Sequence, residues 1–272
     1  MQAAEALRAA AVRLSDKSDT PRLDAELLLA HALGIERQEL LLKLRDVVVP
    51  SEFAQLVGRR VDGEPVAYIV GTRDFWTITL QVTSAVLIPR PDTETLLEAA
   101  VEHFGRDGPR RILDLGTGSG ALLLAALDEW RSASGVGVDI SEEALAVARR
   151  NAERLGMSGR SEFRQGDWGV GIHERFDLVL INPPYISTQA NLPHDVVGHE
   201  PHGALFSGSD GLNDYRRIAP ELSALLKEGG MAAIEIGFDQ GESAARLFSE
   251  QGLNVCCRAD LGGRDRCLII MS

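Results

Sequence analysis

Short apolar stretches alternate with amphipathic stretches from residue 110 to the end of the chain, and this alternation limits the possible folds most strongly. We expect strands at 111–115, 135–140, 161–166, 176–181, 231–237, 254–259 and 266–271. The clearest expected helices lie at 121–130, 142–155, 214–226 and 240–251. Repeated strand–helix units predict a parallel sheet that is covered by helices on both faces.

The final two expected strands are joined only by the short turn Leu-Gly-Gly-Arg at 261–264. A parallel crossover needs a dozen or more residues, so the last strand should run antiparallel to its neighbours. The predicted fold class is therefore α/β, with a Rossmann-like, seven-stranded sheet over 91–272.

Residues 1–64 show a different pattern, with apolar residues at helical spacing between 7 and 14. Thr20 followed by a proline can begin a second helix that Gly34 ends, and Ser51 can cap a further one. This region is predicted to form a small helical bundle. Residues 65–90 are expected to form a β-hairpin linker, because 75–82 is rich in β-branched and aromatic residues.

The linker is expected to turn at 71–74 (Gly-Thr-Arg-Asp) and to end at Pro89-Arg90-Pro91. Asp92 or Thr93 is then expected to cap the helix that opens the larger domain.

The chain is acidic, with a net charge of −12, and the charge is unevenly distributed. Residues 1–66 hold 9 Lys and Arg against 11 Asp and Glu, which leaves a net charge of −10 for the remainder. This excess repels phosphate backbones, so it argues against a nucleic-acid substrate and favours a basic protein partner. We expect a cytoplasmic monomer that is not bound to a membrane, because no apolar run or signal peptide stands out.

Three cysteines give no sign of a disulfide or a metal site. Cys256 and Cys257 are adjacent in an expected strand and face opposite sides, and there is no Cys-x-x-Cys pair. We interpret these two and Cys267 as small hydrophobic core residues, and we expect no bound metal.

A glycine-rich loop, Asp114–Gly120, leaves the first strand of the sheet and opens a helix. Its glycines allow a tight turn and a close approach to a ligand. Asp139 ends the second strand, where a carboxylate can accept both ribose hydroxyls, and Asp167-Trp168 can hold the edge and face of adenine. Asp114 can reach the ammonium group of a methionine moiety. The expected cofactor-binding residues are Asp114, Gly116, Thr117, Gly118, Ser119, Gly120, Asp139, Asp167, Trp168 and Asn182.

The tetrapeptide Asn182-Pro183-Pro184-Tyr185 follows the fourth strand and is the most specific signal in the chain. A planar nitrogen is a poor nucleophile, but two acceptors that take both of its N–H hydrogens can orient it. The Asn182 side-chain oxygen and the Pro183 carbonyl can supply them, and the prolines stiffen the loop. Tyr185 offers a flat face to the substrate. These four residues are the predicted substrate site, and Asn182, Pro183 and Tyr185 the predicted catalytic residues.

These features together predict methyl transfer from S-adenosyl-L-methionine to a planar amide or amine nitrogen. No general base is required, because the methylated nitrogen can lose its proton to water. We therefore assign no catalytic role to His194, His199 or His202. They lie in the irregular stretch 186–211, which is long enough to be a lid or a binding loop.

Several blocks together resemble the release-factor glutamine methyltransferases, the PrmC/HemK family. They are 63–71 (Gly-Glu-Pro-Val-Ala-Tyr-Ile-Val-Gly), Phe75-Trp76, 87–94 (Leu-Ile-Pro-Arg-Pro-Asp-Thr-Glu), the loop Asp114–Gly120, Asn182–Tyr185, Glu200-Pro201 and 210–212 (Asp-Gly-Leu). The resemblance implies methylation of the glutamine in the Gly-Gly-Gln tip of peptide-chain release factors. It also implies that the helical region grips another part of the release factor.

Three further residues carry weaker hypotheses. Phe75 and Pro89-Arg90 are hypothesised to lie over the cofactor or the release-factor tip and to join the domains, and Glu200 to close the long loop over the site. One departure from the family pattern is Arg266-Cys267, and another is the pair Gly262-Gly263, for which we have no interpretation.

Alternative functions remain open from the residues alone. A nucleic-acid methyltransferase could use the same tetrapeptide on an exocyclic adenine or guanine amine, and it would need a basic groove. A non-catalytic adenosine-binding or ribosome-associated adaptor would not need Asn182–Tyr185. A nicotinamide oxidoreductase would have the spacing GxGxxG, whereas this loop has GxGxG.

Overall fold

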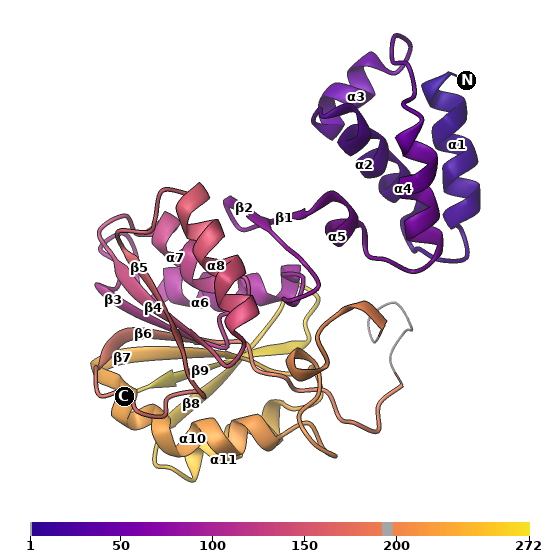
Figure 1. Cartoon of the computed structure of the whole chain (residues 1–272). Coiled ribbons are helices and arrows are strands. Elements are labelled where there is room, and N and C mark those ends of the chain that lie inside the picture. The colour runs from indigo at the N-terminus through magenta and orange to yellow at the C-terminus, as the bar shows by residue number, and fades with distance from the viewer. Residues whose placement is uncertain (1, 192–197) are drawn as a thin grey trace. The chain divides into compact units, whose positions relative to one another are not determined.

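The computed structural model describes residues 2–191 and 198–272 and shows two compact units (Figure 1). One unit holds the described residues up to Thr72 together with 198–199, and the other holds Arg73–Asn191 and Glu200–Ser272. Among the described residues, no helix combines the length and the hydropathy that a membrane span requires.

The first unit is helical, as the sequence predicts. Its helices are α1 (Ala3–Leu14), α2 (Pro21–Leu33), α3 (Arg37–Lys43), α4 (Glu52–Val61) and α5 (Val66–Val70). Helix α2 packs against each of the others, and leucines such as Leu7, Leu28 and Leu40 are fully buried between them. Gly34 ends α2 in the left-handed conformation, as expected. Helix α5 lies within 65–90, where the sequence pattern predicted only a hairpin linker.

The expected capping residues are wrong at two helices. Ser51 precedes α4 with φ −62° and ψ −30°, and Thr93 precedes α6 (Glu94–Phe104) with φ −64° and ψ −21°. Both residues already have helical backbone angles, and neither side chain makes a capping hydrogen bond. An N-cap needs an extended backbone to turn its side chain onto the first turn. Thr93 instead ends a short 3₁₀ helix, Pro91–Thr93.

The hairpin is present, but its turn was misplaced. Strands β1 (Thr72–Phe75) and β2 (Ile78–Gln81) pair around a turn at Trp76-Thr77, so most of 71–74 is strand. Two-residue hairpin turns usually need a left-handed residue, normally glycine or asparagine. Trp76 takes that position with φ 53°, and a tryptophan gives no sequence signal for it.

The second unit is built on a seven-stranded sheet with the order β5-β4-β3-β6-β7-β9-β8. The strands are β3 (Arg111–Leu115), β4 (Ser134–Asp139), β5 (Ser161–Gln165), β6 (Phe176–Ile181), β7 (Leu226–Glu235), β8 (Asn254–Ala259) and β9 (Asp265–Met271). Strand β9 runs opposite to the other six strands of this sheet and pairs antiparallel with both of its neighbours, which confirms the predicted fold class. The first and fourth strands of this sheet in chain order, β3 and β6, are adjacent.

Helices cover both faces of the sheet (Figure 1). One face carries α6, α7 (Ala121–Glu129) and α8 (Glu142–Arg154), and the other carries α10 (Asn213–Leu225) and α11 (Gly241–Ser249). Each layer buries a separate apolar core, represented by Leu123 on one face and Phe248 on the other. Two cores fix the strands, and the strand ends then hold the loops that follow them.

The interpretation of the cysteines as core residues is wrong for two of the three. Cys256 and Cys257 are exposed, and only Cys267 is buried. The first two lie in β8, which is the edge strand of the sheet and is mostly exposed along its length. Cys267 lies in β9, which has a neighbour on each side.

Candidate active site

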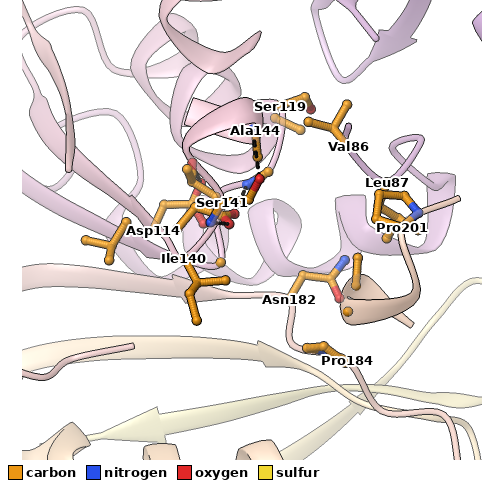
Figure 2. A pocket seen from close by; sticks show the side chains of 18 of the residues that line it. Val86, Leu87, Asp114, Ser119, Ile140, Ser141, Ala144, Asn182, Pro184 and Pro201 are labelled. Carbon is orange, nitrogen blue, oxygen red and sulfur yellow. Dashed lines mark hydrogen bonds between the residues drawn. The ribbon is translucent and has the colours of Figure 1, made fainter. Parts of the chain in front are cut away.

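A cavity of about 570 Å³ lies at the carboxyl ends of the central strands, entirely within the second unit (Figure 2). Segments that follow β3, β4, β5 and β6 converge there, together with 84–90 from the stretch after the hairpin. Most of the predicted site residues line it: Asp114, Gly116, Thr117, Gly118, Ser119, Asp139, Asp167, Trp168, Asn182 and Pro184. Gly120, Pro183 and Tyr185 do not.

Asp114 has an unsatisfied oxygen at this cavity. Its side chain is almost fully buried, and Oδ2 accepts hydrogen bonds from the Thr117 hydroxyl at 2.6 Å and the Leu123 amide at 3.2 Å. Oδ1 has no hydrogen-bond partner among the described residues. Burial raises the pKa of the carboxyl group to about 7. A ligand cation, such as an ammonium group, can bind a buried acceptor of this kind and satisfy it.

Gly116 brings the backbone against an aromatic ring. It has φ 72°, and a Cβ added there would lie 3.2 Å from Cζ3 of Trp168. Trp168 itself has an unusual φ of 49°. Its indole nitrogen donates to Asp214 Oδ1 at 3.2 Å, and the Ser207 hydroxyl donates to Asp214 Oδ2 at 2.7 Å. Asp214 therefore fixes the ring, a role that its place in a predicted helix did not reveal.

The two acidic residues at the ends of β4 and β5 differ in their partners. Asp139 accepts from the Gly118 amide at 2.8 Å and the Ser141 amide at 2.9 Å, so it ties the glycine loop to the next loop. A carboxylate has about four lone-pair positions, which leaves capacity for ribose hydroxyls. Asp167 Oδ2 is paired with Arg217, so only its other oxygen is free of this ion pair.

Asn151 on α8 is a residue that the sequence analysis missed. It is fully buried, and its amide nitrogen donates to the Ser119 carbonyl at 2.9 Å and the Gln81 carbonyl at 3.0 Å. Its side-chain oxygen accepts from the Gln81 amide at 2.7 Å. One amide thus joins strand β2 to the glycine loop, although Asn151 lies 70 residues after Gln81 in the sequence.

Side-chain hydrogen bonds hold the predicted catalytic loop in place. The Asn182 side-chain nitrogen donates to the Thr93 hydroxyl at 3.2 Å, which leaves its oxygen without that constraint. The Tyr185 hydroxyl donates to Glu235 Oε1 at 3.0 Å, and the Tyr185 carbonyl accepts from Gln240 at 2.9 Å. Burial and the carboxylate raise the pKa of Tyr185 well above its ordinary value, so the phenol stays neutral.

Arg90 and Glu200 form an ion pair beside the cavity. Nη2 of Arg90 lies 2.7 Å and 2.8 Å from the two oxygens of Glu200, whose side chain is 2% exposed. Arg90 and the neighbouring Pro201 line the cavity, so the hypotheses for Arg90 and Glu200 agree with their positions. Burial raises the pKa of the Glu200 carboxyl despite the opposing effect of Arg90.

The hypothesis for Phe75 is wrong, and the described histidines of the long loop lie away from the cavity. Phe75 does not lie over the site, because its side chain is 1% exposed and belongs to the core of the sheet domain. It lies at the end of β1, where one face of the strand packs inward. His202 contacts the Phe206 ring with centroids 5.5 Å apart. His194 lies outside the described residues, and neither His199 nor His202 lines the cavity.

Comparisons with known proteins agree with this geometry. A family model described as the PrmC N-terminal domain matches residues 5–71, and one described as a methyltransferase domain matches 107–252. Two curated relatives are named release factor glutamine methyltransferase. The one from Caulobacter vibrioides is 42% identical and covers 97% of this chain and 94% of its own. The one from Cereibacter sphaeroides is 44% identical and covers 98% and 97%.

Solved structures support the fold alone. A methyltransferase from Pyrococcus furiosus superposes with a TM-score of 0.53 at 19% identity, and the match covers 71% of this chain and 87% of that one.

Proposed function

Because the chain belongs to the release factor glutamine methyltransferase family, we propose that the cavity at the carboxyl ends of the central strands joins a cofactor site at Asp114 to a glutamine site at Asn182. The chain is an S-adenosylmethionine-dependent enzyme that methylates the side-chain amide nitrogen of glutamine in the Gly-Gly-Gln motif of release factors. One observation carries the assignment of residues. Asp114, whose buried Oδ1 has no hydrogen-bond partner among the described residues, and Asn182 line the same cavity.

The residues present fit this cofactor. The orphaned oxygen of Asp114 can bind its ammonium group, Asp139 its ribose hydroxyls, and Trp168 with Asp167 its adenine. Gly116, Thr117, Gly118, Ser119 and Gly120 form the loop that lets the backbone come close. When bound, S-adenosylmethionine supplies a methyl group that is already activated by the sulfonium sulfur.

The protein's own contribution is to orient the glutamine nitrogen. The Asn182 side-chain oxygen accepts one N–H bond in the cavity, and Pro184 shapes the cavity wall. The second acceptor in this proposal is the main-chain carbonyl of Pro183, a residue that does not line the cavity but stands between these two lining residues. Tyr185 keeps the loop in place. Holding a nucleophile in line can supply about 7–11 kcal/mol of the barrier reduction. The proton that the nitrogen loses goes to water, because no neighbouring base is needed once the nitrogen carries positive charge.

The roles of the three regions follow from the family, and the kind of partner follows from the acidic net charge of the chain. Residues 1–64 serve as the release-factor-binding domain, 65–90 as the linker and 91–272 as the catalytic domain. The acidic surface attracts a partly basic protein partner. The enzyme acts as a cytoplasmic monomer, without a metal and without nucleic acid as its direct substrate.

Peptide mass spectrometry tests the substrate and the loop together. Release factor is incubated with labelled S-adenosylmethionine and wild type, Asn182→Ala or Asn254→Ala, the last changing an exposed asparagine on β8. Methylation of the Gly-Gly-Gln glutamine by wild type and Asn254→Ala, but not by Asn182→Ala, is the expected result. Transfer to RNA and none to release factor would contradict the proposal and favour the nucleic-acid alternative.

A further inference from the structure

We propose that Gln240 is a positioning residue that holds the backbone of Tyr185 and thereby keeps the catalytic tetrapeptide in place at the cavity. The inference rests on the proposed function, because it concerns how the same loop is presented to glutamine. Gln240 does not line the cavity, whereas Asn182 and Pro184 do (Figure 2). Its side chain can therefore act on the substrate only through the loop that it contacts.

Gln240 is fixed at the turn between β7 and α11. It directly precedes α11, and its carbonyl accepts from the Ala244 amide at 2.8 Å in the first turn of that helix. The residue is buried, with 8% exposed. Its Nε2 donates to the Tyr185 carbonyl at 2.9 Å and to the Gly211 carbonyl at 3.4 Å. Its Oε1 accepts from the Gly237 amide at 3.0 Å. One side chain thus joins three segments: the loop after β6, the turn before α10 and the turn after β7.

These contacts allow the Gln240 amide only one orientation. Its neighbours on one side are two carbonyl oxygens, which need a donor, and its neighbour on the other side is an N–H, which needs an acceptor. If the amide turned over, its oxygen would face two acceptors and its nitrogen a donor, and buried polar groups without partners are costly. The Tyr215 hydroxyl lies 3.4 Å from Oε1 as well, but it has a single hydrogen and a shorter contact, 2.9 Å, with the Glu235 carbonyl. The side chain is therefore a fixed donor for the Tyr185 carbonyl.

Gly211 allows two backbone segments to share this donor. It has φ 75°, and a Cβ added there would clash with the Tyr185 carbonyl oxygen and lie 2.7 Å from Nε2 of Gln240. A side chain at this position would therefore separate the two partners of the hydrogen bond. The block 210–212, which the sequence shares with the family, thus contributes the glycine that lets Gln240 reach Tyr185.

The tetrapeptide depends on contacts of this kind because two of its four residues are prolines. Pro183 and Pro184 have no backbone N–H, so amide hydrogen bonds cannot hold this part of the chain. Asn182 and the Tyr185 hydroxyl are held through their side chains. The bond from Gln240 acts on the main chain instead, one residue beyond Pro184. Since the second acceptor in the proposed function is the main-chain carbonyl of Pro183, a loosened main chain should misplace it.

Two substitutions at Gln240 and one at Gly211 test this role. Gln240→Glu keeps an oxygen for the backbone amide but, when ionised, turns an acceptor toward both carbonyls. Gln240→Met removes all three hydrogen bonds at similar side-chain length, and Gly211→Ala pushes the Tyr185 carbonyl away from an intact Gln240. We expect each variant to lower kcat for release factor about 10- to 100-fold at pH 8, because a misplacement of about 1 Å can cost about 100-fold. The controls Gln251→Glu, at an exposed glutamine, and Gly156→Ala, at φ 69° with nothing within 4 Å, should keep the wild-type kcat.

Two readouts distinguish a misplaced loop from a damaged fold. The first is calorimetric affinity for S-adenosylmethionine, which should stay within about threefold of wild type in every variant because Gln240 and Gly211 lie outside the cavity. The second is the pH profile of Gln240→Glu. A buried carboxyl group that faces two acceptors has a raised pKa, so it is protonated as pH falls and can then donate to the Tyr185 carbonyl. The ratio of wild-type to Gln240→Glu kcat should therefore shrink at least about threefold from pH 8 to pH 6, whereas the ratio for Gln240→Met should stay constant.

A combined variant completes the test and separates the inference from the proposed function. If both changes act on the contact between Gln240 and Tyr185, Gln240→Met/Gly211→Ala should be within about threefold of the slower single variant. Reduced kcat with unchanged cofactor affinity, together with this lack of additivity, supports the inference. Wild-type kcat in both Gln240 variants overturns it, and so does loss of cofactor affinity in parallel with kcat. Absence of methylation by wild type refutes the proposed function itself, and the inference with it.

Discussion

Replacing Asp114 by asparagine should stabilise the protein while it weakens cofactor binding. The pKa of Asp114 is raised from 3.8 to about 7 because its ionised form is buried, and one of its oxygens has no hydrogen-bond partner in the part of the chain that the structure describes. Between pH 4 and 7 the folded state therefore binds more protons at this group than the unfolded state does. Stability falls as pH rises through this range, and the penalty is complete above the folded pKa.

The size of the effect follows from the shift. A shift from 3.8 to about 7 corresponds to about 4 kcal/mol at pH 8, at about 1.4 kcal/mol per pKa unit. At pH 5 the Asp114 carboxyl is largely protonated in the folded state. Its ionisation then lowers the free energy of unfolding by about 2 kcal/mol, by the same linkage relation. The asparagine side chain keeps an acceptor for Thr117 and cannot ionise. Its stabilising effect should therefore grow by about 2–3 kcal/mol from pH 5 to pH 8.

Urea unfolding of wild type and Asp114→Asn, without cofactor and at both pH values, measures this difference in stability. The contributions of other titrating groups cancel because both proteins contain them. Calorimetry should show affinity for S-adenosylmethionine increasing from pH 6 to pH 8 in wild type, because only the ionised carboxylate pairs with the ammonium group. Asp114→Asn should bind about 10- to 100-fold more weakly at pH 8, the range for a charged hydrogen bond. A stability difference that is the same at pH 5 and pH 8 would refute the reasoning.

Two other changes have expected effects on stability or binding. Glu200→Ala removes a carboxylate that is 2% exposed and should lower the free energy of unfolding, measured in urea, by about 1–3 kcal/mol. The control Glu162→Ala removes one partner of an exposed ion pair and should lower it by at most about 1 kcal/mol. Equal losses of unfolding free energy in the two variants would contradict this reasoning. Gly116→Ala adds a Cβ 3.2 Å from Trp168 at φ 72° and should weaken cofactor affinity about tenfold by calorimetry. Gly34→Ala has a similar φ of 65° and nothing within 4 Å, so it should leave that affinity unchanged.

Much of the fold and of the site was accessible from local sequence patterns. The strands at 111–115 and 176–181 have the predicted bounds because they are buried apolar runs that end in polar loops. Asp114 and Asn182, which line the cavity, were predicted as site residues because one lies near the end of such a run and the other follows one, and ligands bind at the carboxyl ends of parallel strands. These features depend on neighbours in sequence, so pattern and spacing were sufficient for them.

The supporting residues were not accessible in the same way. Glu235 is an acidic residue at the end of an expected strand, and its partner Tyr185 is 50 residues away. Asn151 sits within a regular helix with nothing to distinguish it from a surface asparagine. Trp76 takes a turn position that its side chain disfavours, because Glu94 accepts its backbone N–H at 3.0 Å. Tertiary partners decide these cases, and a single sequence does not show them.

The hydrogen bonds of Asn151 have a consequence for how the protein opens. The buried side-chain amide of Asn151 binds both strand β2 and the glycine loop. If either segment moves away, this amide loses hydrogen bonds that also hold the other segment in place. Segments joined in this way tend to open together as one cooperative unit, which amide hydrogen exchange detects. Ligand binding at the loop should then protect the Gln81 amide from exchange, although this amide belongs to the hairpin. We therefore expect strand β2 and the glycine loop to exchange as one foldon.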